Sequence, residues 1–353
     1  MSESVLDYLW DNYVHRFLAE GANYQDLLDL RARTRTFSEW PLRWSEIAEA
    51  YEQRAENAVS AGFTLTAGEH FARAAVYYFF GQFLFWDDPD TKRRVSEHCA
   101  RAFRRAAPYL DPPFLPVEIP FDGITMPGYL RLPKGVSKPP CVLLLNGLDT
   151  TKEEQLVISN LCVQRGLATL TFDGPGQGET FYKMKMWPGY TEAVVAALDF
   201  AAKQPSIDAN RIGVIGRSLG SHYAPRLAAV DDRIKAVVSW GAMFHLRNFR
   251  SIPELTRAGF LFVTGSHTIE QGENYTNSID LTTIAPNIRC PIMIVNGGLD
   301  PITPPENIEL MQAAVKGPSE VLFIADSNHC IHDRPQICRP AMADFMQRQL
   351  HAI

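Results

Sequence analysis

The sequence has no excess of basic residues, no long hydrophobic run and no repeat or low-complexity stretch. Its 353 residues carry 34 Lys+Arg against 40 Asp+Glu, a net charge of −6, and no dense basic block. This balance argues against nucleic acid or an anionic membrane as a partner. The longest apolar pieces, such as 141–145, fall far short of the roughly 20 residues that span a bilayer. A small molecule is therefore the expected partner.

Paired cysteine spacing and an export signal are also lacking. The six cysteines, at 99, 141, 162, 290, 330 and 338, show no C-x-x-C pattern, which indicates reduced thiols. The first residues, MSESVLDYLWDNYVHRF, are acidic and polar where a secretory signal needs a basic start and an apolar stretch. We expect a cytoplasmic protein.

With 46% hydrophobic and 11% aromatic residues, the chain can bury one large core or two moderate ones, which excludes disorder. Residues 1–112 show apolar positions three and four apart and predict an N-terminal, all-helical cap domain. A Pro-rich hinge at 111–116 follows. From 113 to 353, short β runs alternate with helical patterns, which is typical of a parallel sheet.

Two long helices are predicted in the first domain. One covers 40–62, with an apolar stripe of Leu42, Ile47, Ala50, Tyr51 and Ala58, and stops at Gly62. The other spans 64–86 and is apolar nearly all round, so other parts of the protein must bury it. Its many aromatic residues form either a helix core or, in part, the roof of an apolar ligand pocket.

The second domain should open with a hairpin at 117–133, turned at Asp122-Gly123. Six further strands are expected at 141–147, 168–174, 211–218, 235–242, 291–298 and 320–326. Helical patterns lie between most of them. The stretch at about 243–289 is too long for a simple crossover and indicates an inserted helical lid.

The strongest chemical signal is Gly216-Arg217-Ser218-Leu219-Gly220, a G-x-S-x-G between a strand and a helical pattern. Its glycines allow the cramped turn that exposes a serine at the carboxyl edge of the sheet. In this frame Ser218 is the expected nucleophile, and the fold class is α/β, an α/β-hydrolase fold with a mostly parallel central sheet.

A serine at that turn needs an acid and then a histidine later in the chain. Asp300 follows the strand ending at 298, where an orienting acid belongs, although a turn or helix-capping aspartate fits the same position. His329 follows the last strand and is the expected base. His332 is the rival, but its position at the start of the last helix favours a surface or capping role.

Two backbone N–H groups should receive the oxyanion. They belong to Leu219, which follows the nucleophile, and to Leu148, which follows the strand at 141–147. The run DGPGQGE at 173–179 lacks both the phosphate-loop and the dinucleotide pattern and indicates a tight loop beside the site. No metal is expected, since the cluster of His329, His332 and Asp333 lacks zinc-ligand spacing.

These motifs together resemble a known family. The segments that carry the resemblance are NGLDTTKEE, TFDGPGQGE, GRSLG with VVSWG, the later GLD and NHCIH, and the helical GANYQDLLDLRARTRTFSEW and AGEHFARAAVYYFFGQFLFW. The chain is similar to the 2,6-dihydroxypseudooxynicotine hydrolase-like subgroup of α/β-hydrolases and, more distantly, to the polyketide-shortening hydrolases of fungal pigment pathways. The resemblance implies a triad of Ser218, Asp300 and His329, no cofactor and, loosely, a homodimer.

The resemblance also implies hydrolysis of a C–C bond beside a ketone in an aromatic or 1,3-dicarbonyl-like molecule. Aromatic side chains such as Tyr78, Phe83 and Phe244 would suit such a flat substrate. One segment departs from the family: FHLRNFRSIPE is basic where the family places an acid facing substrate, so Arg247 and Arg250 could bind an anionic or hydroxylated ligand. Alternatively, they form a solvated lid surface.

Two other functions remain compatible with this fold. An ordinary carboxylesterase would employ the same triad, because the leaving group alone separates the two reactions. A non-catalytic regulatory protein of this fold should carry a damaged triad, whereas all three residues are present in order.

Overall fold

The computed structural model describes residues 3–352. They divide into two compact units, with the boundary between Pro116 and Val117, at the end of the Pro-rich hinge. None of the six cysteines forms a disulfide. Within the described residues, no helix combines the length and apolar composition needed to cross a membrane.

The first unit is helical up to the strand that begins at Phe114 and continues into the second unit. Its helices are α1 (Glu3–Ala19), α2 (Tyr24–Arg33), α3 (Trp40–Ser60), α4 (Thr64–Gln82) and α5 (Pro89–Ala106). Local sequence sets their starts: the Asn23 side chain accepts from two backbone N–H groups of α2, and Asp88 does the same for α5. Gly62, with φ of +80°, takes the left-handed conformation just after α3.

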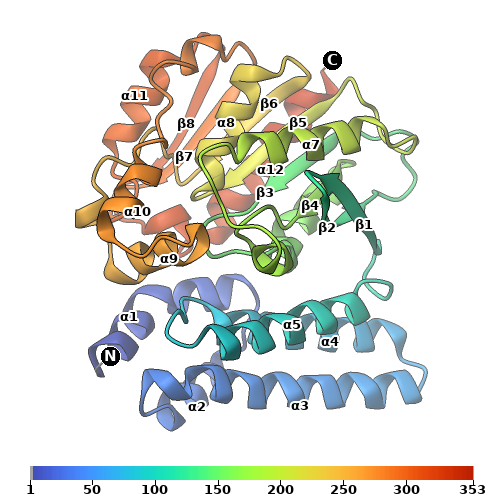
Figure 1. Cartoon of the computed structure of the whole chain (residues 1–353). Helices are drawn as coiled ribbons and strands as arrows, with labels where there is room; N and C mark the ends of the chain where they lie inside the picture. The colour runs from blue at the N-terminus through green and yellow to red at the C-terminus, as the bar shows by residue number, and fades with distance from the viewer. Residues whose placement is uncertain (1–2, 353) are drawn as a thin grey trace. The chain divides into compact units, whose positions relative to one another are not determined.

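The core of this unit is aromatic. Helix α4 lies between α3 and α5 (Figure 1), and its Phe80 is fully buried against Phe17 and Trp44. The indole N–H of Trp40 donates to the Phe80 carbonyl at 2.7 Å. These aromatic residues of α4 thus pack in the core of the helical unit.

Two details of the predicted helices are wrong. Helix α4 ends at Gln82 rather than 86, because Phe83 turns extended and Leu84 has φ of +54°. At this end the Gln82 carbonyl accepts from the Lys92 ammonium at 2.6 Å and from the Phe85 N–H at 3.3 Å. The predicted stripe of α3 is also misplaced: Leu42 is 57% exposed, whereas Trp44 is buried.

The second unit is built on an eight-stranded sheet in the order β1-β2-β4-β3-β5-β6-β7-β8. The strands are β1 (Phe114–Phe121), β2 (Ile124–Arg131), β3 (Cys141–Leu145), β4 (Ala168–Phe172), β5 (Ile212–Arg217), β6 (Ile234–Trp240), β7 (Ile292–Gly297) and β8 (Ser319–Ile324). Strand β2 pairs antiparallel with β4, and from β4 to β8 all pairs are parallel. The predicted hairpin turns at Asp122-Gly123, both with positive φ.

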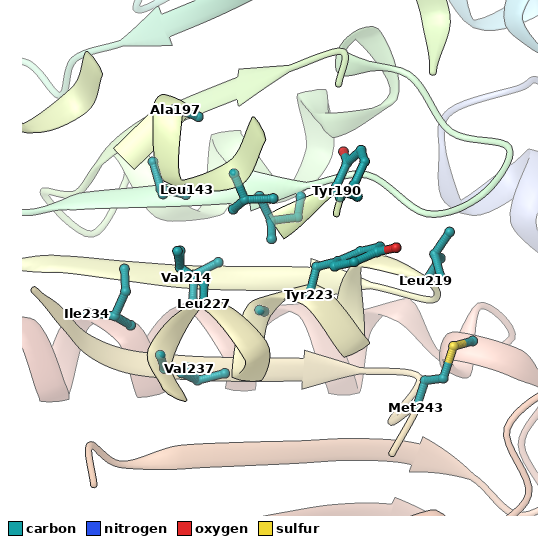
Figure 2. Packing of buried hydrophobic residues seen from close by; sticks show 14 of the residues in the cluster. Leu143, Tyr190, Ala197, Val214, Leu219, Tyr223, Leu227, Ile234, Val237 and Met243 are labelled. Carbon is teal, nitrogen blue, oxygen red and sulfur yellow. The ribbon is translucent and has the colours of Figure 1, made fainter. Parts of the chain in front are cut away.

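Helices cover both faces of this sheet. They are α6 (Leu156–Val163), α7 (Thr191–Ala202), α8 (Gly220–Val230), α11 (Glu306–Ala314) and α12 (Pro335–His351). Figure 2 shows Leu143, Val214 and Val237 of the strands packed with residues of α7 and α8. Their neighbours Val142, Ile215 and Val238 point to the other face, where α6 and α12 cover them. The central strands are therefore buried on both sides, as a parallel sheet requires.

The segment between β6 and β7 holds two extra helices, α9 (Glu254–Thr264) and α10 (Ile269–Thr276), in the predicted lid. Buried contacts tie it to the rest of the second unit. The Tyr275 hydroxyl lies 2.8 Å from that of Tyr223 in α8, and Phe262 stacks on Phe181. The lid thus packs against the helix that follows Ser218.

Replacing Phe80 by Ala removes the ring that Trp44, Phe17 and the neighbouring rings surround. We expect Phe80→Ala to lower the free energy of unfolding by about 3–5 kcal/mol, because the lost contacts leave a cavity. Phe63→Ala, at a side chain 65% exposed, is the control and should change it by less than about 0.5 kcal/mol. Chemical denaturation followed by tryptophan fluorescence measures both; equal effects would contradict the packing described.

Candidate active site

Ser218 occupies a strained turn between β5 and α8. Its φ is +54°, rare for a residue with a side chain, and its N–H donates to the Trp240 carbonyl at 2.7 Å. The two flanking glycines are required by space: a Cβ at Gly216 would lie 1.9 Å from the Gly220 carbonyl oxygen, and one at Gly220 would lie 2.7 Å from that of Asn146. The G-x-S-x-G pattern therefore folds as the sequence predicts.

Ser218, His329 and Asp300 form one hydrogen-bonded chain. His329 Nε2 lies 2.9 Å from Ser218 Oγ, and His329 Nδ1 lies 2.6 Å from Asp300 Oδ2. The Asp300 side chain is fully buried, whereas that of His329 is 18% exposed. The three residues come from the loops after β5, β7 and β8, which meet at the carboxyl edge of the parallel strands.

Asp300 serves its own loop as well as His329. Its Oδ1 accepts from the N–H groups of Ile302 and Thr303 at 2.8 and 2.9 Å, and its Oδ2 accepts from the Thr303 hydroxyl at 2.6 Å. The carboxylate thus makes the turn contacts that the sequence allowed, while its Oδ2 also faces the imidazole; a catalytic role for Asp300 stays a prediction. The turn contacts hold the carboxylate within hydrogen-bond distance of His329 Nδ1.

The charge of Asp300 raises the pKa of His329. Burial alone would lower the pKa of His329, but the carboxylate beside Nδ1 raises it, and the net pKa lies well above its ordinary value. A protonated His329 is therefore stabilised next to Ser218. This is the environment in which an imidazole accepts a proton from a nucleophile.

His332 does not reach Ser218. It lies in the loop after His329, only 5% exposed, with its ring 5.8 Å from that of Trp240. Of the surface or capping role expected for it, the surface role is wrong, because the side chain is buried beside the Trp240 indole. Asp333 turns away too, accepting hydrogen bonds from the Ser327 hydroxyl and the Asn328 N–H.

Trp240 connects the backbone of the Ser218 turn to that of the loop carrying His329, a role that the sequence did not reveal. Its carbonyl holds the N–H of Ser218, and its indole N–H donates to the Cys330 carbonyl at 2.6 Å. Gly241 follows with φ of +76°, and a Cβ there would lie 3.3 Å from His329 Cε1 and 2.6 Å from Cys330 Sγ. The S-W-G segment at the end of β6 is the only sequence signal for this arrangement.

Two backbone N–H groups next to Ser218 are available to a ligand. The N–H groups of Leu148 and Leu219 donate to no other atom of residues 3–352. Leu219 caps the start of α8, and Leu148 follows Gly147, at which a Cβ would lie only 3.1 Å from Ser218 Cβ. An oxyanion role for these two N–H groups stays a prediction.

Within the described residues, one carboxylate cluster has the spacing to hold a metal: Glu153, Asp173 and Glu179. The Lys152 ammonium already contacts all three, at 2.6, 2.7 and 2.7 Å. Burial would lower the pKa of Lys152, but the three carboxylates raise it well above its usual value, so the ammonium stays charged. The cation of this cluster is the lysine itself.

The aromatic residues expected at the substrate are buried. Tyr78 lies in the helical unit with its hydroxyl 2.7 Å from Glu52 Oε2, and Phe83 packs there against Tyr13. Phe244 is in the second unit, just after β6, and its N–H donates to Asn307 Oδ1 at 2.9 Å. A substrate role for these three side chains stays a prediction.

Arg247 and Arg250 lie on the surface of the lid. Their side chains are 61% and 62% exposed and pair with Asp280 at 2.7 Å and Glu273 at 2.6 Å, respectively. These contacts match the solvated lid surface that the sequence left as the alternative. A substrate role for either arginine stays a prediction and would require it to leave its carboxylate.

Comparison with known proteins identifies relatives of nearly the same length. The 2,6-dihydropseudooxynicotine hydrolase of Paenarthrobacter nicotinovorans is 34% identical over 335 residues, which cover 94% of this chain and 90% of the relative. The crystal structure of the 2,6-dihydroxy-pseudo-oxynicotine hydrolase superposes with a TM-score of 0.89 at 33% identity, covering 96% of both chains. The resemblance inferred from the motifs is thus confirmed.

A fungal relative and a family profile agree. The alpha/beta hydrolase xenA of Xenoacremonium sinensis is 34% identical over 221 residues, 59% of this chain and 52% of the relative. The profile described as "Esterase FrsA-like" matches residues 19–311. Because this profile covers most of the chain and the bacterial hydrolase matches nearly all of it, the protein is a hydrolase that belongs to the FrsA-like esterase family of the α/β-hydrolases.

Proposed function

We propose that this chain is a serine hydrolase that cleaves a C–C bond beside a ketone in a small aromatic or 1,3-dicarbonyl-like molecule. The hydrogen-bonded chain from Ser218 through His329 to Asp300 supports the serine mechanism. The likeness over 94% of the chain to a pseudooxynicotine hydrolase supports the substrate class.

In this mechanism His329 Nε2 takes the proton of Ser218 as Oγ attacks the ketone carbon. The carbonyl oxygen becomes an oxyanion and accepts hydrogen bonds from the Leu148 and Leu219 N–H groups; one such donor contributes roughly 3 kcal/mol of transition-state stabilisation. Asp300 stabilises the imidazolium formed.

Collapse of the tetrahedral intermediate then breaks the bond between the carbonyl carbon and the leaving carbon. The electron pair goes to the leaving carbon, which takes the proton from His329, and the acyl group stays on Ser218. Only an enolate or an electron-rich ring can accept that pair, which limits the substrate to such ketones. Water, deprotonated by His329, releases the carboxylic acid.

A carboxylesterase is the second candidate, because the family profile that covers residues 19–311 is described as an esterase. The same residues would act, with an alkoxide or phenoxide as leaving group. The reaction thus depends on which leaving group the bound substrate presents.

The sequence-based expectations of a cytoplasmic location and a homodimer stay predictions. Neither is needed for the mechanism, since Ser218, His329, Asp300 and both N–H donors belong to the second unit of one chain.

Ser218→Ala tests the serine mechanism with a matched pair of substrates, an aryl 1,3-diketone and an aryl ester of similar size. We expect mass spectrometry to show diketone cleavage to an acid and a methyl ketone, and Ser218→Ala to lower it by at least about 10⁴-fold with unchanged thermal unfolding. Cleavage of the ester alone would favour the esterase, and turnover retained by Ser218→Ala would exclude Ser218 as nucleophile.

The pH dependence tests the pairing of His329 with Asp300. The base must be neutral, and its pKa is raised, so kcat/KM should increase with pH along a limb whose midpoint lies above about 6.5. Asp300→Asn removes the charge that raises this pKa, so the midpoint should move to lower pH and the plateau should fall about 10³–10⁴-fold.

His332→Gln is the control for the pH measurement, because His332 lies nearby but does not contact Ser218. It should leave the midpoint in place, whereas His329→Gln should remove turnover. A midpoint that Asp300→Asn leaves unchanged, or that His332→Gln moves, would show that another group is the base.

A further inference from the structure

The Gln177 side chain links the glycine-rich loop after β4 to the loop that carries Leu148. Only 3% exposed, it donates from Nε2 to the Gly147 carbonyl at 2.8 Å and more weakly to that of Asn146 at 3.3 Å. Its Oε1 accepts from the Tyr190 hydroxyl at 2.7 Å and from the Gly174 N–H at 3.3 Å. All the hydrogen bonds of this amide are therefore satisfied within the second unit.

These partners allow only one orientation of the amide. The Gly174 N–H can only donate, and the carbonyl oxygens of Gly147 and Asn146 can only accept. Rotating the Gln177 amide by 180° would place its oxygen against two carbonyl oxygens. The Nε2 donor is therefore fixed toward the Gly147 carbonyl.

The Gly147 carbonyl belongs to the same planar peptide unit as the Leu148 N–H. In a trans peptide these two groups point in opposite directions, so a donor that holds the carbonyl also sets the direction of the N–H. A hydrogen bond to the carbonyl polarises the unit and makes its N–H a stronger donor. Gln177 thus contacts the carbonyl side of the Gly147–Leu148 peptide, opposite the Leu148 N–H.

Tyr190 holds Gln177 in this position, and two glycines leave room for the neighbouring side chains. Tyr190 is buried, with its ring 4.5 Å from that of Tyr223 in α8 and tilted against it; Figure 2 shows the two rings next to each other. A Cβ at Gly174 would lie 2.3 Å from the Tyr190 hydroxyl oxygen, and one at Gly178 would lie 2.1 Å from Asp173 Oδ2. The glycines of DGPGQGE thus admit the close approach of these side chains.

We propose that Gln177 is a positioning residue for the oxyanion: through the Gly147–Leu148 peptide it aims and strengthens the Leu148 N–H. The inference rests on the proposed function in two respects, that Ser218 is the nucleophile and that the Leu148 N–H receives the oxyanion. It does not depend on whether the substrate is a ketone or an ester, since both form an oxyanion at the same place.

The test measures acylation of Ser218 by p-nitrophenyl acetate and phosphonylation by a fluorophosphonate probe, which need only the nucleophile and the oxyanion donors. Gln177→Met keeps the size of the side chain but removes the donor. We expect it to lower the acylation rate constant about 10–100-fold while KM changes less than about threefold, because the oxyanion forms only during reaction.

Gln155→Met is the matched control. Gln155 is also a buried glutamine of this region, but its Nε2 donates to Asn146 Oδ1 at 2.8 Å and not to the Gly147–Leu148 peptide. It should lower thermal stability about as much as Gln177→Met and slow acylation far less. Equal slowing by both variants would reduce Gln177 to a structural role and overturn the proposal.

Gln177→Glu gives a second readout that loss of structure does not mimic, and it decides the matter should Gln177→Met fail to fold. A protonated glutamic acid can donate to the Gly147 carbonyl, whereas a carboxylate cannot. The ratio of its acylation rate to that of the wild type should therefore rise up to tenfold per unit as pH falls. The same ratio for Gln177→Met should be independent of pH.

The outcomes separate the two proposals. A wild-type chain that cleaves the ester but not the ketone would remove the C–C assignment and leave the role of Gln177 to be decided by the same variants. A wild-type Ser218 that reacts with neither probe would overturn both. A Gln177→Met that acylates as fast as the wild type, or a pH-independent ratio for Gln177→Glu, would overturn the role of Gln177 alone.

Discussion

The rest of this site depends on one constraint, the close approach of the loops that follow β3, β5, β6 and β8 at the carboxyl edge of the parallel strands. Side chains at Gly216, Gly220 or Gly241 would collide with the backbone or with neighbouring side chains, and one at Gly147 would be tight against Ser218. Because these positions are glycine, Ser218 can sit at a positive φ within hydrogen-bond distance of His329. The parallel strands bring the loops together at one edge, and the glycines leave room for their close approach.

Buried hydrogen bonds keep these loops in place. Trp240 connects the Ser218 turn to the loop of His329, and Asp300 stabilises its own turn with one oxygen while the other faces the imidazole. Beside them, the Lys152 ammonium holds the carboxylates of Glu153, Asp173 and Glu179 in a cluster. A buried polar network in which each member has a partner is rigid, as an oxyanion site requires.

Much of the fold and the triad geometry could be predicted because both depend on local sequence. The six central strands read as apolar runs, and Ser218, Asp300 and His329 each follow one of them. What could not be predicted depends on partners distant in sequence. Helix α4 ends at Gln82, whose carbonyl is bound by the distant Lys92, and His332 is buried beside Trp240. Likewise, DGPGQGE indicated a tight loop, but only the structure shows that Gln177 reaches the Leu148 peptide.

The most direct test of the central claim is to trap the covalent intermediate. Wild-type enzyme would be mixed with the aryl 1,3-diketone, quenched in acid within milliseconds to seconds, digested and analysed by peptide mass spectrometry. The account predicts that the peptide containing Ser218 gains the mass of the acyl group of the ketone and loses it as the acid product appears. Turnover of the diketone with Ser218 never modified at any time point would contradict it.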